Sequence, residues 1–307
     1  SRMARVPRMK KTVVLLVMAW CFYGIGPAQS AENLIEHGRY VFNVAGCVSC
    51  HTSDQLMAGG RPVETPFGTF HSPNATPHRE SGIGSWTEED FVRALREGVS
   101  PQGKHYYPAF PYPSYTRMTR EDMRALYAYL MSLPESTREE RSHRLHWPFS
   151  YRPFLSHWKA MRFSPGVYSP DPQQSPEWNR GAYLAEALGH CNECHTPRDF
   201  MGAPRRDRYL AGTCAGPDGR PVSNITQDRE TGIGSWSYEG LAGFLKTGRK
   251  PDGSYTSSLM AEVLGTSCMQ LNREDLHALV TYLQSVPPVR NDLGTRCAPY
   301  DDSWMYE

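Results

Sequence analysis

Apolar side chains recur at helical spacing in six segments of the chain, whereas no segment alternates convincingly between apolar and polar residues as a strand would. Between Thr87 and Glu97, Phe91, Val92 and Leu95 share one face, and the initial Thr-x-x-Asp sequence is typical of a capping box. The predicted helices cover residues 31–45, 87–97, 120–133, 175–188, 237–247 and 273–286. The pattern therefore predicts an all-α fold.

These six helices fall into two sets of three, because the sequence repeats itself. Gly-Ile-Gly-Ser-Trp occurs at 82–86 and again at 232–236. Arg-Glu-Asp begins the last helix of each half, directly after the expected N-caps Thr119 and Asn272. The repeat predicts two tandem domains of one fold. They are placed at 31–134 and 176–289, with a linker at 135–175 and a tail at 290–307.

The predicted linker is rich in aromatic residues and proline. Trp147-Pro148-Phe149 opens an aromatic stretch that runs through Trp158, and a segment rich in Pro and Ser follows. The preferred interpretation is that these aromatic side chains pack across both domains. The alternative is a docking patch for a partner protein, because contiguous exposed apolar surface marks interaction sites.

Residues 1–30 have the pattern of an export signal. A basic start precedes an apolar run at 13–25 that is too short to cross a bilayer comfortably, and small residues precede an expected cleavage after Ser30. An uncleaved anchor is the alternative. Without this segment the chain holds 28 Lys and Arg against 32 Asp and Glu, so it is mildly acidic. No basic patch indicates nucleic acid, and no second apolar run indicates a membrane span.

Two copies of the sequence Cys-x-x-Cys-His indicate the chemistry, at 47–51 and 191–195. In such a motif the two thiols form thioether bonds with the vinyl groups of a haem, and the histidine binds its iron. A zinc site built from paired cysteines is the alternative, but zinc does not require a histidine directly after each second cysteine. The sequence therefore predicts two covalently bound haem c groups. Their attachment residues are Cys47, Cys50, Cys191 and Cys194, and their proximal ligands are His51 and His195.

Each haem iron is expected to take a distal ligand as well, usually methionine or histidine. In the first half Met118 is favoured, because it lies at the turn before the last helix, whereas Met123 lies inside that helix. In the second half Met260 is favoured over Met269. The weaker candidates are Met57, which is too near the proximal histidine in sequence, and the loop histidines His71, His78 and His105.

Three more residues are assigned to the surroundings of the haems. Arg198 follows the second motif closely and is a candidate for a bidentate contact with a haem propionate; an ordinary surface arginine is the alternative. Trp86 and Trp236, at equivalent positions of the repeat, are expected in the haem wall or the core rather than in catalysis.

Three cysteines remain outside the motifs and the export signal: Cys214, Cys268 and Cys297. An oxidising compartment favours one disulfide among them and leaves one free thiol. The preferred pair is Cys214–Cys268, and the alternative is Cys268–Cys297, which is closer in sequence.

Taken with the two Gly-Ile-Gly-Ser-Trp segments, residues 107–112, 180–184, 189–198 and 260–263 resemble the multihaem cytochrome c subunits of membrane-associated alcohol, aldehyde, gluconate and fructose dehydrogenases. The resemblance covers residues 33–289. It implies tandem domains similar to class I cytochromes c, with Met118 and Met260 as distal ligands. It also implies electron transfer from a quinoprotein, flavoprotein or molybdenum dehydrogenase to quinone or another cytochrome.

Typical subunits of that group carry three Cys-x-x-Cys-His motifs, and this chain carries two. The expectation is therefore a periplasmic diheme cytochrome that relays electrons from a dehydrogenase to a cytochrome, a terminal oxidase or quinone. The periphery of the inner membrane is the alternative location. The alternative is a diheme enzyme, such as a thiosulfate dehydrogenase or a peroxidase, for which Cys214 or Cys268 would be an unusual iron ligand. The set of axial ligands would discriminate between the two.

Overall fold

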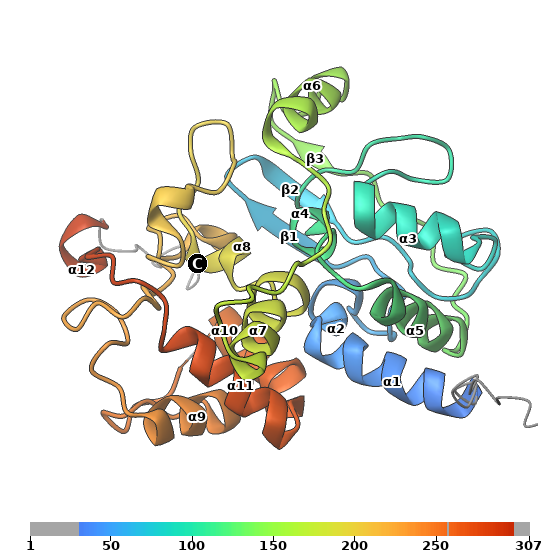
Figure 1. Ribbon diagram of the computed structural model, residues 1–307. Coiled ribbons are helices and arrows are strands. Elements are labelled where there is room, and N and C mark those ends of the chain that lie inside the picture. Colours follow the sequence, from blue (N-terminus) through green and yellow to red (C-terminus); the bar gives the residue numbers. More distant parts are fainter. Residues whose placement is uncertain (1–30, 257, 298–307) are drawn as a thin grey trace, which may run out of the picture.

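The computed structural model describes residues 31–256 and 258–297, so the predicted export signal and the end of the predicted tail lie outside the described residues. Two groups of helices lie beside each other, with a small sheet and helix α6 above them in the view of Figure 1. The first half contains α1 (Ala31–Val44), α2 (Cys47–His51), α3 (Glu88–Glu97), α4 (Tyr112–Tyr115) and α5 (Arg120–Met131).

The second half has its own set of helices. They are α7 (Pro176–Tyr183), the π-helix η1 (Leu184–Leu188), α8 (Asn192–His195), α9 (Tyr238–Thr247), α10 (Ser258–Thr266), α11 (Arg273–Leu283) and α12 (Leu293–Arg296). The short 3₁₀ turns η2 (Arg206–Arg208), η3 (Pro217–Gly219) and η4 (Cys268–Gln270) lie between them. Helix α10 was not among the helices expected from the sequence.

The predicted helix starts are confirmed by their caps. The Thr87 side chain accepts a hydrogen bond from the Asp90 backbone while the Asp90 carboxylate accepts one from the Thr87 backbone, which completes the capping box. Thr119 and Asn272 cap α5 and α11 through their side chains. The helix ends differ from the prediction, since α5 and α11 stop two to three residues early and the helix expected at 175–188 passes into the π-helix η1.

One close helix contact occurs in both halves at equivalent positions. A Cβ atom added to Gly38 of α1 would lie 1.9 Å from the Ala125 carbonyl oxygen of α5. A Cβ atom added to Gly181 of α7 would lie 2.0 Å from the Ala278 carbonyl oxygen of α11. Only glycine permits this approach, so the first and last helices of each half pack backbone against backbone. The division into two domains at the expected boundaries stays a prediction.

The fold is mainly helical, as expected, but the first half also carries a three-stranded antiparallel sheet in the order β1-β2-β3, which the sequence did not predict. Strands β1 (Pro62–Thr65) and β2 (Gly68–His71) form a hairpin, and β3 (Arg144–Leu145) comes from the predicted linker. Gly68 has a φ of 116°, and a Cβ atom there would lie 2.4 Å from the Arg144 carbonyl oxygen. The strands are too short to show alternation, and β3 pairs with residues more than seventy positions earlier.

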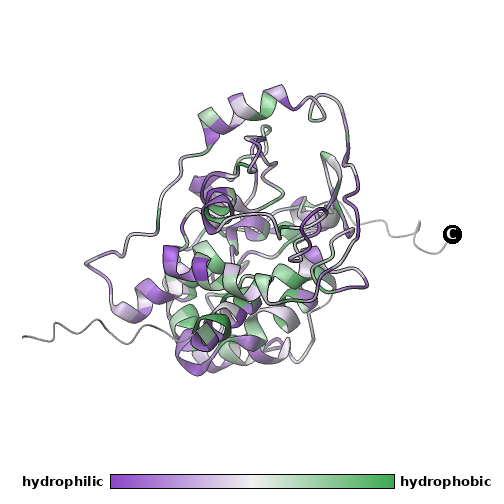
Figure 2. Cartoon of the chain, turned by 90° about the vertical axis from the view of Figure 1, so that its right-hand side faces the viewer, coloured by the Kyte–Doolittle hydropathy of each residue, from purple (hydrophilic) through white to green (hydrophobic). Residues whose placement is uncertain are grey.

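The predicted linker also forms helix α6 (Pro153–Arg162), which contacts both halves. Lys159 Nζ donates a 3.0 Å hydrogen bond to the Gly98 carbonyl of the first half, and Trp158 Nε1 donates one of 2.8 Å to the Met201 carbonyl of the second. Figure 2 shows α6 at the top of the molecule, with hydrophobic and hydrophilic turns side by side. Helix α6 therefore contacts both halves, but among the aromatic side chains that were expected to pack in this way, Trp147, Tyr151 and Phe154 are exposed.

A reciprocal pair of tyrosine–carboxylate contacts joins the halves. Tyr40 of α1 donates a 2.5 Å hydrogen bond to Asp275 of α11, and Tyr183 of α7 donates one to Asp122 of α5. Tyr40 and Tyr183 are equivalent in the repeat, as are the two aspartates. The contact between the halves therefore has approximate twofold symmetry, with each half supplying one donor and one acceptor.

The cations beside these carboxylates differ between the halves. His37 lies 2.7 Å from Asp122, whereas Arg180, at the equivalent position, binds Asp275 through two 2.7 Å hydrogen bonds. The hydrogen bond to Asp122 raises the pKa of His37. Burial alone would raise the pKa of Asp275, but the hydrogen bonds from Arg180 and Tyr40 hold it below its usual range.

Candidate haem sites

Each Cys-x-x-Cys-His motif lies on a short helix that starts from an unusual backbone conformation. Helix α2 contains the whole first motif and begins after Gly46, whose φ is 62°. Helix α8 contains most of the second motif, and His190, with a φ of 37°, occupies the position equivalent to Gly46. One helical turn brings the two sulfurs of a motif to the same side, because residues three apart share a helix face.

Both predicted proximal histidines are oriented by a backbone carbonyl. His51 Nδ1 lies 3.0 Å from the Pro73 carbonyl oxygen, and His195 Nδ1 lies 2.8 Å from that of Ser223. Since a carbonyl only accepts, Nδ1 carries the proton in each ring and Nε2 is left free to bind a metal. Burial lowers the pKa of both histidines, which favours the neutral, ligating form.

The first cysteine of each motif is partly buried against the core. Burial raises the pKa of Cys47 and of Cys191 to about 12, so both are neutral thiols near pH 7. A depressed pKa marks reactive and metal-binding thiolates, and these two cysteines lack that mark. In residues 31–256 and 258–297, no three His, Cys, Asp or Glu side chains are grouped so that they could hold a metal ion.

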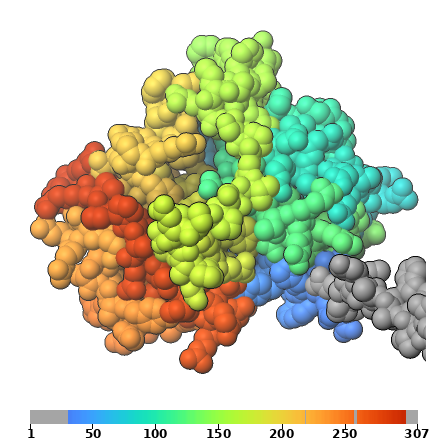
Figure 3. Space-filling model, viewed as in Figure 1, coloured from blue at the N-terminus to red at the C-terminus, as the bar shows by residue number. Residues whose placement is uncertain are grey.

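A cavity of about 1120 Å³ lies between the two halves. Cys47, Cys50 and His51 of the first motif line it, and so does Cys194 of the second. The β1–β2 hairpin, α6 and the segment around residue 200 surround it, and Figure 3 shows the hollow between that segment and the linker. The lining is mainly apolar and aromatic, as a flat and largely hydrophobic cofactor requires. The residues present therefore fit a haem attached to the first motif.

Met118 is fully buried at the turn before α5, where its backbone N–H donates to the Tyr115 carbonyl at 2.9 Å. Met123 is fully buried within α5, as expected of a core residue. Met57 is also buried, with a φ of 58°. Burial therefore does not distinguish these methionines, and Met118 as the distal ligand stays a prediction.

Met260 lies on α10, a helix that contributes to the cavity wall. One face of α10 lines the cavity through Leu259, Glu262 and Val263. Met260 shares another face with Leu264, four residues later, which is fully buried in the core. Met260 is partly buried against this core and is not among the residues that line the cavity. Met269, in η4, is partly buried against the same core, and the choice between the two stays a prediction.

The rival histidines have partners of their own in two of three cases. His78 Nδ1 lies 2.9 Å from the Ser81 hydroxyl, and His105 Nδ1 lies 3.1 Å from Lys159 Nζ. His71 Nδ1 is buried without a hydrogen-bond partner, for which nothing in the structure gives a reason. Trp86 and Trp236 are partly buried against the core, as expected.

Arg198 lines the cavity but is held by its own loop. Its Nη1 donates to the Gly202 carbonyl at 2.8 Å, and its Nη2 forms a 2.5 Å ion pair with Glu193. A contact with a haem propionate stays a prediction. An ion pair between Arg61 and Glu262 joins the two halves in the same region and had no signal in the sequence, because its partners lie 201 positions apart.

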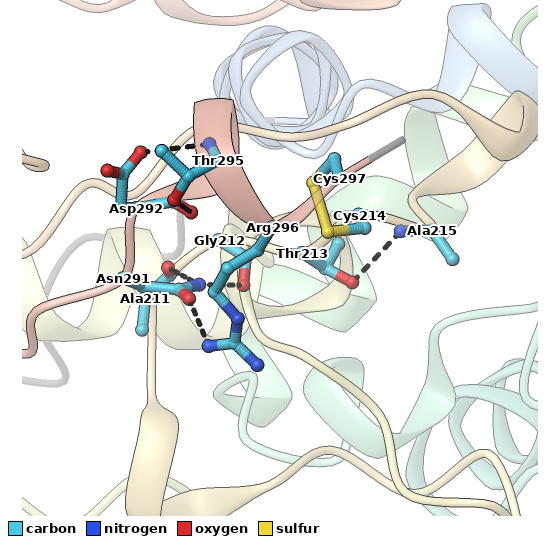
Figure 4. The surroundings of a disulfide bond; sticks show 10 residues. All are labelled: Ala211, Gly212, Thr213, Cys214, Ala215, Asn291, Asp292, Thr295, Arg296 and Cys297. Carbon is cyan, nitrogen blue, oxygen red and sulfur yellow. Dashed lines mark hydrogen bonds between the residues drawn. A yellow bond between two sulfur atoms is a disulfide. The ribbon is translucent and has the colours of Figure 1, made fainter. Parts of the chain in front are cut away.

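The disulfide is Cys214–Cys297, so both pairings expected from the sequence are wrong. Helix α12 returns to the loop that carries Cys214, and Asn291 fixes this return by donating to the Ala211 and Gly212 carbonyls (Figure 4). Cys268 is free, and burial raises its pKa to about 11. The two cysteines lie 83 positions apart in sequence, and no local sequence pattern indicates that they pair.

Helices that carry Cys-x-x-Cys-His motifs, proximal histidines with a fixed tautomer and a large apolar cavity at the thiols define a c-type cytochrome. Comparison with known proteins agrees. The cytochrome c family model matches residues 35–134. Over 260 residues the chain is 39% identical to a diheme cytochrome c-type protein of Cereibacter sphaeroides, with 82% of this chain and 86% of that protein covered.

Dehydrogenase subunits are among the relatives as well. The chain is 42% identical over 267 residues to the fructose dehydrogenase cytochrome subunit of Gluconobacter japonicus, covering 85% of this chain and 54% of that one. It is 37% identical over 289 residues to the gluconate 2-dehydrogenase cytochrome c subunit of Pantoea cypripedii, covering 91% and 65%. The chain thus spans between half and two thirds of these two subunits. It belongs to the c-type cytochrome family that includes them and the diheme protein.

No helix among the described residues has both the length and the apolar character that crossing a bilayer requires.

Proposed function

We propose that this chain is a diheme electron carrier that accepts electrons from a partner dehydrogenase and delivers them to a respiratory acceptor. The observation that carries the proposal is the duplicated site: each motif has a histidine whose Nδ1 is held by a backbone carbonyl. The names of the relatives, a diheme cytochrome and dehydrogenase cytochrome subunits, support the same conclusion.

In this proposal a bound haem supplies one-electron redox chemistry, and the protein holds and tunes it. Cys47, Cys50, Cys191 and Cys194 attach the two haems, and His51 and His195 present Nε2 to the irons. Met118 and Met260 supply the distal thioethers, which raise the potentials relative to a second imidazole. The apolar lining of the cavity excludes water, which tunes the potential further.

We further propose that the carrier acts in the periplasm after removal of residues 1–30. The Cys214–Cys297 disulfide supports this location, because structural disulfides form and persist in oxidising compartments. Because Cys214 is part of this disulfide, it cannot be the unusual iron ligand that the alternative, a diheme enzyme, would need. Cys268 remains free, but it is a partly buried thiol with a raised pKa.

The donor is proposed to dock on the face formed by α6 and the segment around residue 200. Phe154 and Phe200 line the cavity yet remain 55% and 88% exposed, and Trp147, which precedes the lining residue Pro148 in sequence, is 83% exposed. Residues 141–170 hold five Lys and Arg and no Asp or Glu, although the chain beyond residue 30 is acidic overall. This face therefore complements an acidic partner surface, which would bring the donor to the cavity.

The test uses purified, haem-loaded protein and the dehydrogenase that co-purifies with it. We expect substrate-dependent reduction of both haems only when that dehydrogenase is present, with a rate that falls as salt is added. Trp147→Ser with Phe200→Ser should slow this reduction, while Tyr255→Ser, at an exposed aromatic residue outside the cavity lining, should not. Rapid turnover of thiosulfate or peroxide by the protein alone would instead show that the protein is a diheme enzyme.

A further inference from the structure

Helix α10 of the second half is bonded to the attachment helix of the first. The hydroxyls of Ser49, inside the first Cys-x-x-Cys-His motif, and of Thr266, at the end of α10, lie 2.8 Å apart. Thr266 Oγ1 donates its own proton to the Glu262 carbonyl at 2.9 Å, so Ser49 is the donor between the two hydroxyls. Ser267, directly after α10, donates a 2.7 Å hydrogen bond to the Val44 carbonyl. Helix α10 is therefore fixed against the first haem motif.

Glu262 lies one turn before Thr266 on α10 and also binds the first half. Its two carboxylate oxygens accept hydrogen bonds of 2.5 and 2.7 Å from the two terminal nitrogens of Arg61. Such a fork fixes the orientation of the guanidinium, because each nitrogen pairs with one oxygen. Gly59, two residues before Arg61, donates a 2.8 Å hydrogen bond to the His51 carbonyl. The ion pair is therefore only two residues from a backbone contact with the proposed proximal histidine.

Arg61 and Glu262 line the cavity together with Cys50, where the residues fit the first haem. Their side chains are 32% and 31% exposed. An ion pair that is this open to water contributes little to stability, so stability gives no reason for it. The lining of the cavity is mainly apolar, and charges act more strongly across an apolar region than through water. The two charges are therefore placed to act on a haem in the cavity.

The direction of each effect follows from the charge of the iron. Uptake of one electron removes one positive charge from a ferric haem. A positive side chain nearby therefore favours the ferrous form and raises the midpoint potential, whereas a negative one lowers it. While Arg61 and Glu262 are paired, their effects on the iron largely cancel. Removing either charge leaves the other unbalanced, so the two removals have effects of opposite sign.

We propose that Glu262 of the second half sets the midpoint potential of the first haem, by holding Arg61 and balancing its charge. The inference rests on the proposed two-haem function. Glu262 is a positioning residue in this role, because it orients Arg61 beside the cavity. The first haem site is then completed by a helix of the other half, and its potential depends on the contact between the halves.

The test measures the midpoint potentials of the haem-loaded full chain by spectroelectrochemical titration. The potential that disappears when Cys47 and Cys50 are changed to Ala belongs to the first haem. Glu262→Gln should raise this potential and shift the equilibrium severalfold toward the ferrous form, because Arg61 keeps its charge. Arg61→Gln should lower it by a similar factor. The variant with both changes should return close to wild type, because neither charge remains.

Two controls separate charge from packing. Arg61→Lys keeps the positive charge but loses the fork, so its potential should stay near wild type. Glu230→Gln breaks another pair of the second half, with Arg290, which lies outside the cavity lining. It should leave the potential of the first haem unchanged. A purely structural role would shift Glu262→Gln and Arg61→Gln in the same direction, since a loosened site admits water in both variants.

Shifts of the same sign in Glu262→Gln and Arg61→Gln, or no shift in either, overturn the proposal. If one of these variants loses the first haem, the sign of the shift in the other decides. Loss of the haem from both also overturns the proposal and makes the pair part of haem retention. Opposite shifts in a protein that no dehydrogenase reduces would support the role of Glu262 and reject the relay function alone.

Discussion

Replacing Asp275 by Asn should weaken the contact between the halves more than the same replacement at Asp122. Asp275 has a side chain 7% exposed and binds Arg180 through two hydrogen bonds of 2.7 Å. Arginine cannot release its proton, so Asp275→Asn leaves a partly buried cation without its counter-charge. Breaking a fully buried pair costs about 3–5 kcal/mol, and we expect about 2–3 kcal/mol because Arg180 keeps some contact with water.

At Asp122 the cation is His37, which can lose its proton when its partner loses its charge. Asp122→Asn should therefore cost about 1–2 kcal/mol at pH 8, the value of the weakened hydrogen bonds. Since Asp122 raises the pKa of His37, the stability from that pair is fully present below pH 6.5 and is lost as pH rises through the raised pKa. The cost of Asp122→Asn should then grow toward pH 5.5, while that of Asp275→Asn stays level.

Urea unfolding of the haem-loaded proteins at pH 5.5 and pH 8 measures both costs. Glu36→Gln, which removes an exposed ion pair with Arg39, is the control and should change the unfolding midpoint little. A cost for Asp122→Asn at pH 8 equal to or above that for Asp275→Asn would refute the reasoning. It would show that the tyrosine–carboxylate bonds, and not the two cations, determine the strength of the contact.

Three further outcomes are expected. Changing Cys47 and Cys50 to Ala should remove one covalent haem from the intact mass and leave the other; a wild-type protein without any haem mass would contradict the assignment. Met118→Ala and Met260→Ala should each abolish the methionine-to-ferric-iron absorption band of one haem and lower its potential, so unchanged spectra in both would contradict these ligands. Cys297→Ser should lower the free energy of unfolding by about 2–4 kcal/mol, because the disulfide constrains the unfolded chain, and equal urea midpoints would count against it.

Features set by local chemistry were predictable from the sequence. A helix start depends on a side chain within three residues of it, which is why Thr87, Thr119 and Asn272 were placed correctly. The haem motifs could be predicted for the same reason, since their two thiols and imidazole lie within five residues. The carbonyls of Pro73 and Ser223, which orient the two histidines, could not be predicted, because every residue has a backbone carbonyl and the sequence does not show which one a histidine contacts.

Features set by contacts between distant segments were missed. Strand β3 exists only because the linker returns to β2, and Cys297 meets Cys214 only because α12 folds back onto its loop. Helix α10 was missed for a further reason. It has two covered faces, with Val263 toward the cavity and Leu264 toward the core, so its sequence is apolar on more than one face and lacks the stripe of a surface helix.

Where the halves meet, the repeat is imperfect in a way that bears on the proposed relay. Two identical sites in identical surroundings would have nearly equal potentials and no preferred direction for an electron. The helices retain the repeat, since Gly38 and Gly181 make the same close contact. Other positions do not, because His190 occupies the position equivalent to Gly46, and α6, which lines the cavity, has no counterpart in the repeat. Duplication thus accounts for two similar motifs. In the proposed relay, a preferred direction of electron transfer between the haems would come from the positions at which the two halves differ.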